Sequence, residues 1–193
     1  MPIAFIVDGI SEKKIVQRLC SGVQVRTTDL NGRDVTLQAI ATKVESLIRL
    51  LRGRYFPIFV VVDREDRNES SAEIEREIRM LLHEKGLPVE DIVIACADRM
   101  IENWILAGTV QYAGEACDIL RGQAGSDGLR GKGVLKDFLR QRKIVYGETT
   151  VGVEMFCGMD FEAAARRSDS CRRFLVEISP FCPKFANKDF QAT

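Results

Sequence analysis

Three short apolar runs, each ending in an aspartate, constrain the fold of this chain more than any other feature of its sequence. They are "IAFIVD", residues 3–8, "PIFVVVD", residues 57–63, and "DIVIACAD", residues 91–98. Unbroken apolar runs of this length, rich in β-branched residues, are typical of strands buried on both faces of a parallel sheet. A further strand is predicted at 23–27, where apolar and polar residues alternate.

Helical periodicity fills the intervals between these strands. A first helix is predicted to begin at Ser11, directly after the first strand. A second covers 37–51 and ends at Gly53, and a third has its apolar positions within 74–82 and ends at Gly86. Because buried strands alternate with amphipathic helices, we expect an α/β fold with a mostly parallel sheet flanked by helices.

The pattern changes beyond the last of these strands. Residues 100–120 are predicted to be helical, 121–133 form a glycine-rich polar loop, and helical spacing resumes at Val134. A chain of 193 residues suits a core domain with an extension. We therefore expect an α/β core over 1–107 and a mainly helical C-terminal portion over 108–193, packed together as a single structural unit.

Composition excludes several classes of protein. No apolar run approaches the length of a membrane span, and the N-terminus lacks a basic segment of the secretory type, so we expect a cytoplasmic protein. The six cysteines show no CxxC pairing, which predicts reduced thiols and neither a disulfide framework nor a zinc site. His83 is the only histidine, and its place near a helix end favours a dipole role.

Carboxylates gather where the predicted strands end. The carboxyl ends of parallel strands face the ligand crevice of an open sheet, so Asp8, Asp63 and Asp98 are expected at one edge. Asp63 also opens an acidic stretch, and another acid follows Asp98 by four positions; these further acids are Glu65, Asp66, Glu69 and Glu102. Clustered carboxylates repel unless a cation lies between them, and hard oxygen ligands favour Mg²⁺ or Mn²⁺. Ordinary helix N-caps remain the alternative for each acid.

Basic residues are concentrated between Arg121 and Lys143, although the chain as a whole has a formal net charge of zero. Such a run is either a solvated face or a surface that follows phosphates, and Lys132 is our candidate phosphate-binding residue within it. The glycine-rich loop lacks the GxxxxGK[ST] pattern, so it is not a P-loop. Trp104 is predicted to lie in the core.

Four segments together resemble a known family. "FIVDGISEKKIVQRL" looks like the opening of a Toprim domain, and "FVVVDRED" resembles the second Toprim motif, a strand that ends in a D-x-D pair. "ADRMIENWILA" and "YGETTVGVEMFCGMDFEAAARRSDSCRRFLVEI" resemble segments of the DUF4276 family of small bacterial Toprim-like proteins. The order and spacing of the four segments cover nearly the whole chain.

The resemblance implies a Toprim-like α/β fold and metal-dependent phosphoryl transfer on nucleic acid. Related Toprim domains occur in topoisomerases, primases and OLD-type nucleases of phage defence. This chain departs from the family at two places. Asp8 stands where glutamate is usual, which shortens the reach by about 1.5 Å. The second acidic pair is Asp63 with either Glu65 or Asp66.

Our first hypothesis is a Mg²⁺- or Mn²⁺-dependent nuclease, with a place in bacterial phage defence. Under this hypothesis the metal ligands are Asp8, Asp63, Glu65 and Asp66, and the catalytic residues are Asp8, Asp63 and Glu102. Glu12 caps a helix or orients a water molecule. Lys132 binds the substrate phosphate. The alternative is a catalytically degraded module that binds a protein partner such as an ATPase. The neutral charge and the shorter Asp8 favour the alternative, and the full acidic set opposes it.

Overall fold

The computed structural model describes the whole chain except residues 31–34, 113–114, 121–123, 186 and 192–193. Arg121, the first residue of the predicted basic run, therefore lies outside the described residues. Within the described part, four strands form one parallel sheet in the order β2-β1-β3-β4. Their bounds are β1 Ala4–Val7, β2 Gln24–Thr27, β3 Ile58–Asp63 and β4 Ile92–Ala97.

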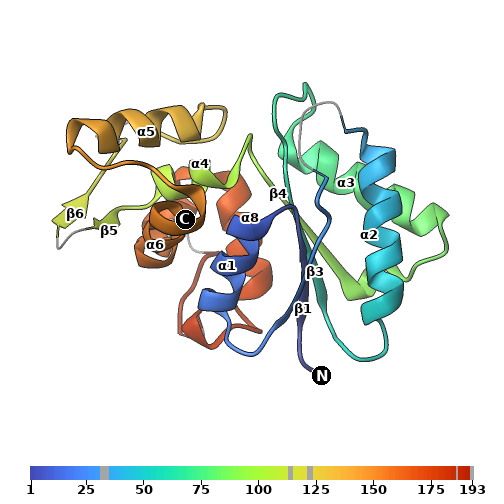
Figure 1. Ribbon diagram of the computed structural model, residues 1–193. Helices are drawn as coiled ribbons and strands as arrows, with labels where there is room; N and C mark the ends of the chain where they lie inside the picture. Colours follow the sequence, from blue (N-terminus) through green and yellow to red (C-terminus); the bar gives the residue numbers. More distant parts are fainter. Residues whose placement is uncertain (31–34, 113–114, 121–123, 186, 192–193) are drawn as a thin grey trace.

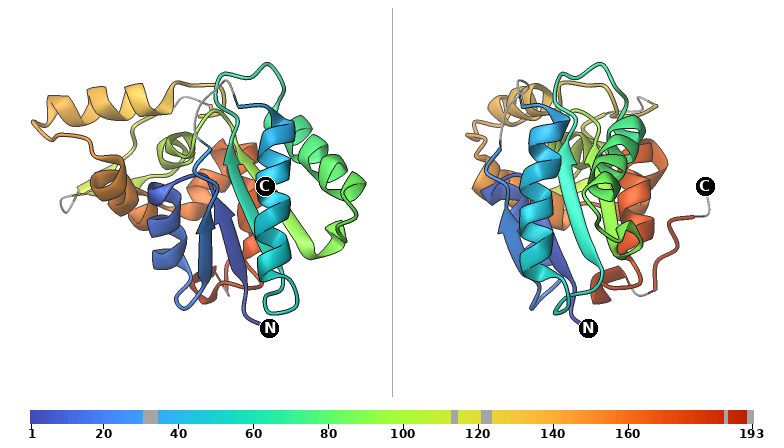
Figure 2. Two further views of the ribbon diagram at one scale, coloured as in Figure 1. Left: turned by 45° about the vertical axis from the view of Figure 1, so that its right-hand side comes forward. Right: turned by 90° about the vertical axis from the view of Figure 1, so that its right-hand side faces the viewer.

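Helices cover both faces of this sheet (Figures 1 and 2). On one face lie α2, Leu37–Leu51, and α3, Ser71–Glu84. The other face carries α1, Ile10–Leu19, α4, Ile101–Ala107, and α8, Asp169–Ile178. The predicted α/β fold with a parallel sheet is confirmed, and burial on both faces explains why the strands read as continuous apolar runs.

Alternation along the strands divides the core into two layers. Phe5 and Val7 of β1 belong to the core on the α1 side, and Ala4 and Ile6 belong to the core on the α2 side. The register pairs Val7 of β1 with Val61 of β3, so the ends of these two strands lie side by side.

The C-terminal portion contains a β-hairpin that the sequence did not predict. We expected helix throughout 100–120, but α4 ends at Ala107, and the antiparallel strands β5, Val110–Tyr112, and β6, Glu115–Cys117, follow it. Gly108, the C-cap of α4, lies against the Met159 segment, where an added Cβ would be 2.9 Å from the Met159 Cβ. Val110 also forms a β-bridge with Met159, a long-range contact that periodicity cannot reveal.

The remaining elements are largely helical, as predicted from Val134 onward. They are α5 Gly131–Gln141, a π-helical turn η2 Glu148–Gly152, α6 Val153–Gly158, α7 Phe161–Arg167 and a short 3-10 turn η3 Pro183–Phe185. Another 3-10 turn, η1 Val89–Asp91, precedes β4. Trp104 is fully buried and stacks on Phe174 of α8 at 5.0 Å between ring centroids. None of the helices found in the described residues has the length and apolar character needed to cross a membrane.

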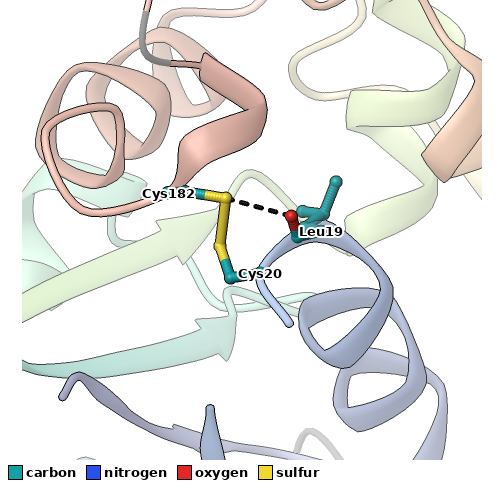
Figure 3. Close-up of a disulfide and its surroundings, with 3 residues drawn as sticks. All are labelled: Leu19, Cys20 and Cys182. Carbon is teal, nitrogen blue, oxygen red and sulfur yellow. Dashed lines mark hydrogen bonds between the residues drawn. A yellow bond between two sulfur atoms is a disulfide. The ribbon is translucent and has the colours of Figure 1, made fainter. Parts of the chain in front are cut away.

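One pair of cysteines contradicts the prediction of reduced thiols. Cys20, at the end of α1, forms a disulfide with Cys182 in the C-terminal tail (Figure 3). The tail folds back under α1, which brings the two Cα atoms to 5.3 Å although 162 positions separate them in the sequence. No local spacing signals such a long-range pair. The other four cysteines are free.

Candidate active site: an acidic cleft

A cleft of about 460 Å³ lies at the carboxyl ends of β1 and β3, bordered by α1, α4 and η2. Acids dominate its lining: Asp8, Glu12, Asp29, Asp63, Glu65, Glu102 and Glu148. Lys132 is the only basic lining residue among those the structure describes. Such a concentration of carboxylates makes this cleft the candidate active site, since each ionised acid disfavours the ionisation of its neighbours.

Asp8 joins the ends of three strands. One carboxylate oxygen accepts a hydrogen bond from the backbone N–H of Asp63 at 3.1 Å, and the other accepts one from the Thr28 hydroxyl at 3.2 Å. Burial raises the pKa of Asp8 from its ordinary 3.8 to about 7, and the charges of Glu12 and Glu65 add to this effect. The Asp8 carboxyl is therefore fixed in position but is poorly compensated when ionised.

Asp63 is the last residue of β3 and lies beside Asp8. No described residue donates a hydrogen bond or forms an ion pair to its carboxyl group. Burial raises the pKa of Asp63 well above its usual range, and the charges of Asp8 and Glu12 raise it further. A carboxyl group with neither a donor nor a cation beside it is costly to ionise, so a bound cation would stabilise it.

In the turn after β3, one acidic residue faces the cleft and the next is exposed to solvent. Glu65 has a positive φ of 60°, its backbone N–H donates to the Arg99 carbonyl at 2.7 Å, and its side chain lines the cleft. Asp66 points away, is exposed, and pairs with Arg99 at 2.7 Å. Between the two pairings left open by the sequence, the structure brings Asp63 together with Glu65.

Asp98 ends the third acidic strand but does not line the cleft. Its carboxylate accepts hydrogen bonds from Arg64 Nε and from the backbone N–H of Gly128. These contacts join the turn after β3 to the loop before α5. Asp98 therefore has an anchoring role, although it lies at the same sheet edge as Asp8 and Asp63.

Glu102 enters the cleft from the first turn of α4. It is only 6% exposed, and its Oε1 accepts a hydrogen bond from the Tyr146 hydroxyl at 2.8 Å. Burial raises the pKa of Glu102 despite this hydrogen bond. The structure thus brings Glu102 to the same cleft as Asp8, Asp63 and Glu65.

Glu12 and Lys132 complete the set predicted from the sequence. Glu12 Oε2 accepts from the backbone N–H of Gly9 at 3.0 Å, which closes a capping arrangement at the start of α1, and its side chain also lines the cleft. Lys132, in the first turn of α5, forms an ion pair with Glu148 across the cleft. This ion pair raises the pKa of Lys132, so the lysine stays cationic there.

Sequence reasoning missed four residues of the site: Thr28, Asp29, Tyr146 and Glu148. Thr28 and Asp29 follow β2 directly, so the strand-end rule that found Asp8 and Asp63 also applies to them. Tyr146 lies two residues before η2 and Glu148 begins it. The position of this short turn over the cleft depends on contacts with α1 and α5. One of those contacts joins Lys14 Nζ of α1 to the Thr149 carbonyl at 3.1 Å.

The cleft offers the type of ligand that a hard divalent cation prefers, because its lining supplies carboxylate oxygens. The buried Asp63 carboxyl group also has no partner among the described residues. In their positions here, no three acidic, histidine or cysteine side chains of the described residues converge on a single point. Binding an ion would therefore require side-chain rotation at the cleft, for which the partly exposed Glu65 is suited.

Comparison with known proteins gives no relative: no family model matches the chain, and no curated protein or solved structure matches it. The resemblance to Toprim proteins therefore rests on the quoted segments alone. What the cleft can do chemically follows from its own residues and their geometry.

Proposed function

We propose that the acidic cleft binds Mg²⁺ or Mn²⁺ and that the protein is a metal-dependent phosphodiester hydrolase acting on nucleic acid. The observation that carries this proposal is the pair Asp8 and Asp63. Their carboxyl groups lie at the ends of adjacent strands, both have raised pKa values, and Asp63 has no partner among the described residues. A divalent cation would stabilise both ionised groups at once.

Four acidic lining residues have distinct roles under this proposal. Asp8 and Asp63 are the principal ligands, and Glu65 is the supporting ligand. Asp8 is already oriented by the Asp63 N–H and the Thr28 hydroxyl, so it loses little conformational freedom on binding. When bound, the metal supplies Lewis-acid stabilisation of charge on the phosphoryl oxygens. Glu102 lies within the same cleft, where it can accept a proton or act as a further ligand.

The surface beside the cleft favours a polyanionic substrate. Lys132 lines the cleft at the start of α5, and Lys136 is exposed further along the same helix, as is Arg140, which pairs with Asp137. Arg130 precedes the helix and is also exposed. Because the chain has no net charge, this local excess of cations supports a specific phosphate-binding role for α5 more than a general affinity for anions.

The test is a cleavage assay with plasmid, single-stranded DNA and RNA in Mg²⁺, Mn²⁺ or EDTA. We expect cleavage that requires the metal and that is lost in Asp63→Asn. Asp66→Asn is the matched control, because it removes an acid three positions away that points out of the cleft. Cleavage that persists in EDTA or in Asp63→Asn would contradict the proposal.

The same assay addresses the alternative function. A wild-type protein that cuts none of the three substrates in either metal would favour a module that binds a partner protein such as an ATPase. A role in phage defence remains a prediction from the family resemblance.

A further inference from the structure

We propose that Glu102 acts as a further metal ligand, that Tyr146 is a positioning residue that orients the Glu102 carboxylate for this role, and that Gly152 leaves the space that the Tyr146 ring occupies. This inference rests on the proposed function, because it assigns a residue to the same site. Neither residue was found from the sequence. The contacts that carry the inference are the Tyr146–Glu102 hydrogen bond and the close approach of Tyr146 to Gly152.

The hydrogen bond fixes one oxygen of a nearly buried carboxylate. The Tyr146 hydroxyl donates to Glu102 Oε1 at 2.8 Å, and Glu102 is 6% exposed. Across the described part of the chain, no other side chain donates to the Glu102 carboxylate. Tyr146 is therefore the side chain that fixes Oε1, and Glu102 itself lines the cleft.

Gly152 makes room for the tyrosine ring. A Cβ at position 152 would lie 2.7 Å from the Tyr146 hydroxyl oxygen and 3.3 Å from Cζ. Every residue other than glycine would push the hydroxyl away from its present place. The backbone N–H of Gly152 also donates to the Gly147 carbonyl at 2.9 Å, which closes the turn that follows Tyr146.

Two contacts from neighbouring helices hold η2 in place. Lys14 of α1 donates to the Thr149 carbonyl at 3.1 Å, and Lys132 of α5 forms its ion pair with Glu148. Consequently η2 is tied to α1 and α5, each of which contributes lining residues to the cleft. Tyr146 lies two residues before η2, so these contacts restrict where its phenol can lie, and it can orient the carboxylate with little further loss of side-chain entropy on metal binding.

The test measures Mn²⁺ binding by calorimetry and by electron paramagnetic resonance in wild type, Tyr146→Phe and Tyr55→Phe. Tyr55 is the matched control because it packs against the α2 side of the core and does not line the cleft. For Tyr146→Phe we expect the Mn²⁺ dissociation constant to rise roughly 10- to 100-fold, as is usual when a ligand loses its hydrogen-bonding partner. The spectrum of bound Mn²⁺ should change in this variant and stay unchanged in Tyr55→Phe.

Gly152→Ala provides an independent variant. It should weaken Mn²⁺ binding to a similar extent, whereas Gly152→Ala combined with Tyr146→Phe should be little weaker than either single variant, because both remove the same hydrogen bond. Melting curves in EDTA show whether each variant is folded before its affinity is interpreted.

The outcomes separate this inference from the proposed function. Wild type that binds Mn²⁺ together with Tyr146→Phe that binds it within about twofold would overturn the positioning role alone. Wild type that binds no Mn²⁺ would overturn the metal site and the positioning role together. A spectrum altered equally in Tyr55→Phe would also count against Tyr146.

Discussion

Replacing Asp8 with asparagine should stabilise the protein at alkaline pH in the absence of metal. The carboxamide can keep both contacts of the carboxylate: its oxygen accepts from the Asp63 N–H, and its nitrogen donates to the Thr28 hydroxyl. The substitution therefore removes a charge without removing the hydrogen bonds. The Asp8 charge also raises the pKa of Asp63, so removing that charge makes the Asp63 carboxyl group easier to ionise.

The magnitude follows from the pKa of Asp8, which burial raises from 3.8 to about 7. Each pKa unit corresponds to about 1.36 kcal/mol, so full ionisation of this carboxyl in the folded state costs up to about 4 kcal/mol. The side chain is partly exposed, and solvent screening reduces this cost. We expect Asp8→Asn to raise the free energy of unfolding by about 2 kcal/mol at pH 8.

The raised pKa of Asp8 also determines how the free energy of unfolding changes with pH. Between about pH 4 and pH 7 the folded state binds more protons at Asp8 than the unfolded state does, so wild-type stability falls as the pH rises through this window. The gap between Asp8→Asn and wild type should thus be small near pH 4 and reach its full size above about pH 7.

Urea denaturation in EDTA at pH 4.5 and pH 8 measures this gap. Asp66→Asn is the control, since its exposed carboxyl pairs with Arg99 outside the cleft; it should change stability by less than about 0.5 kcal/mol apart from any loss of that ion pair. The reasoning would be refuted if Asp8→Asn were no more stable than wild type at pH 8, or if the gap were equal at both pH values.

Saturating Mg²⁺ should reverse the order of stability. A ligand present at 100 times its dissociation constant stabilises the folded state by about 2.7 kcal/mol, and this gain requires the Asp8 carboxylate in wild type. Asp8→Asn should gain much less. The Asp8 carboxylate would then destabilise the metal-free protein but be required to bind the ion. Such a trade-off between stability and function is expected at a binding site.

Three further substitutions test the packing of the fold. Cys182→Ser removes the disulfide to Cys20 and should lower the free energy of unfolding by about 3–5 kcal/mol in urea, a difference that dithiothreitol abolishes; equal stability without reductant would contradict the pairing. Ser170→Ala leaves the buried Trp104 indole N–H, now 2.8 Å from the Ser170 hydroxyl, without its acceptor and should cost about 1–3 kcal/mol by thermal melting; a neutral result would refute this. Gly131→Ala places a methyl group against the side chain and backbone of α4 and should cost about 1–3 kcal/mol by the same measurement, which unchanged melting would contradict.

The sequence predicted the parallel sheet and the positions of Asp8 and Asp63 because both depend on local pattern. Apolar runs mark doubly buried strands, and parallel strands bring their carboxyl ends to one edge. The choice between Glu65 and Asp66 was beyond the sequence. It depends on the left-handed backbone of Glu65, which sends the two side chains in different directions.

The features that were missed depend on contacts between distant segments. The hairpin of β5 and β6 replaces the expected helix because Gly108 and Val110 meet Met159. The disulfide joins two residues whose spacing carries no signal, and Tyr146 reaches Glu102 from 44 positions away. Hydrophobic periodicity reports which face of an element is buried, but not which distant segment covers it.

The most direct test of the account is the location of Mn²⁺ in crystals of the protein soaked with the ion. Anomalous diffraction should show a peak between the Asp8 and Asp63 carboxylates, within roughly 2.0 to 2.5 Å of oxygens from both, and the peak should vanish in Asp63→Asn. A soaked crystal without a peak at this position, or with an equal peak in Asp63→Asn, would contradict the claim that the acidic cleft is a metal site.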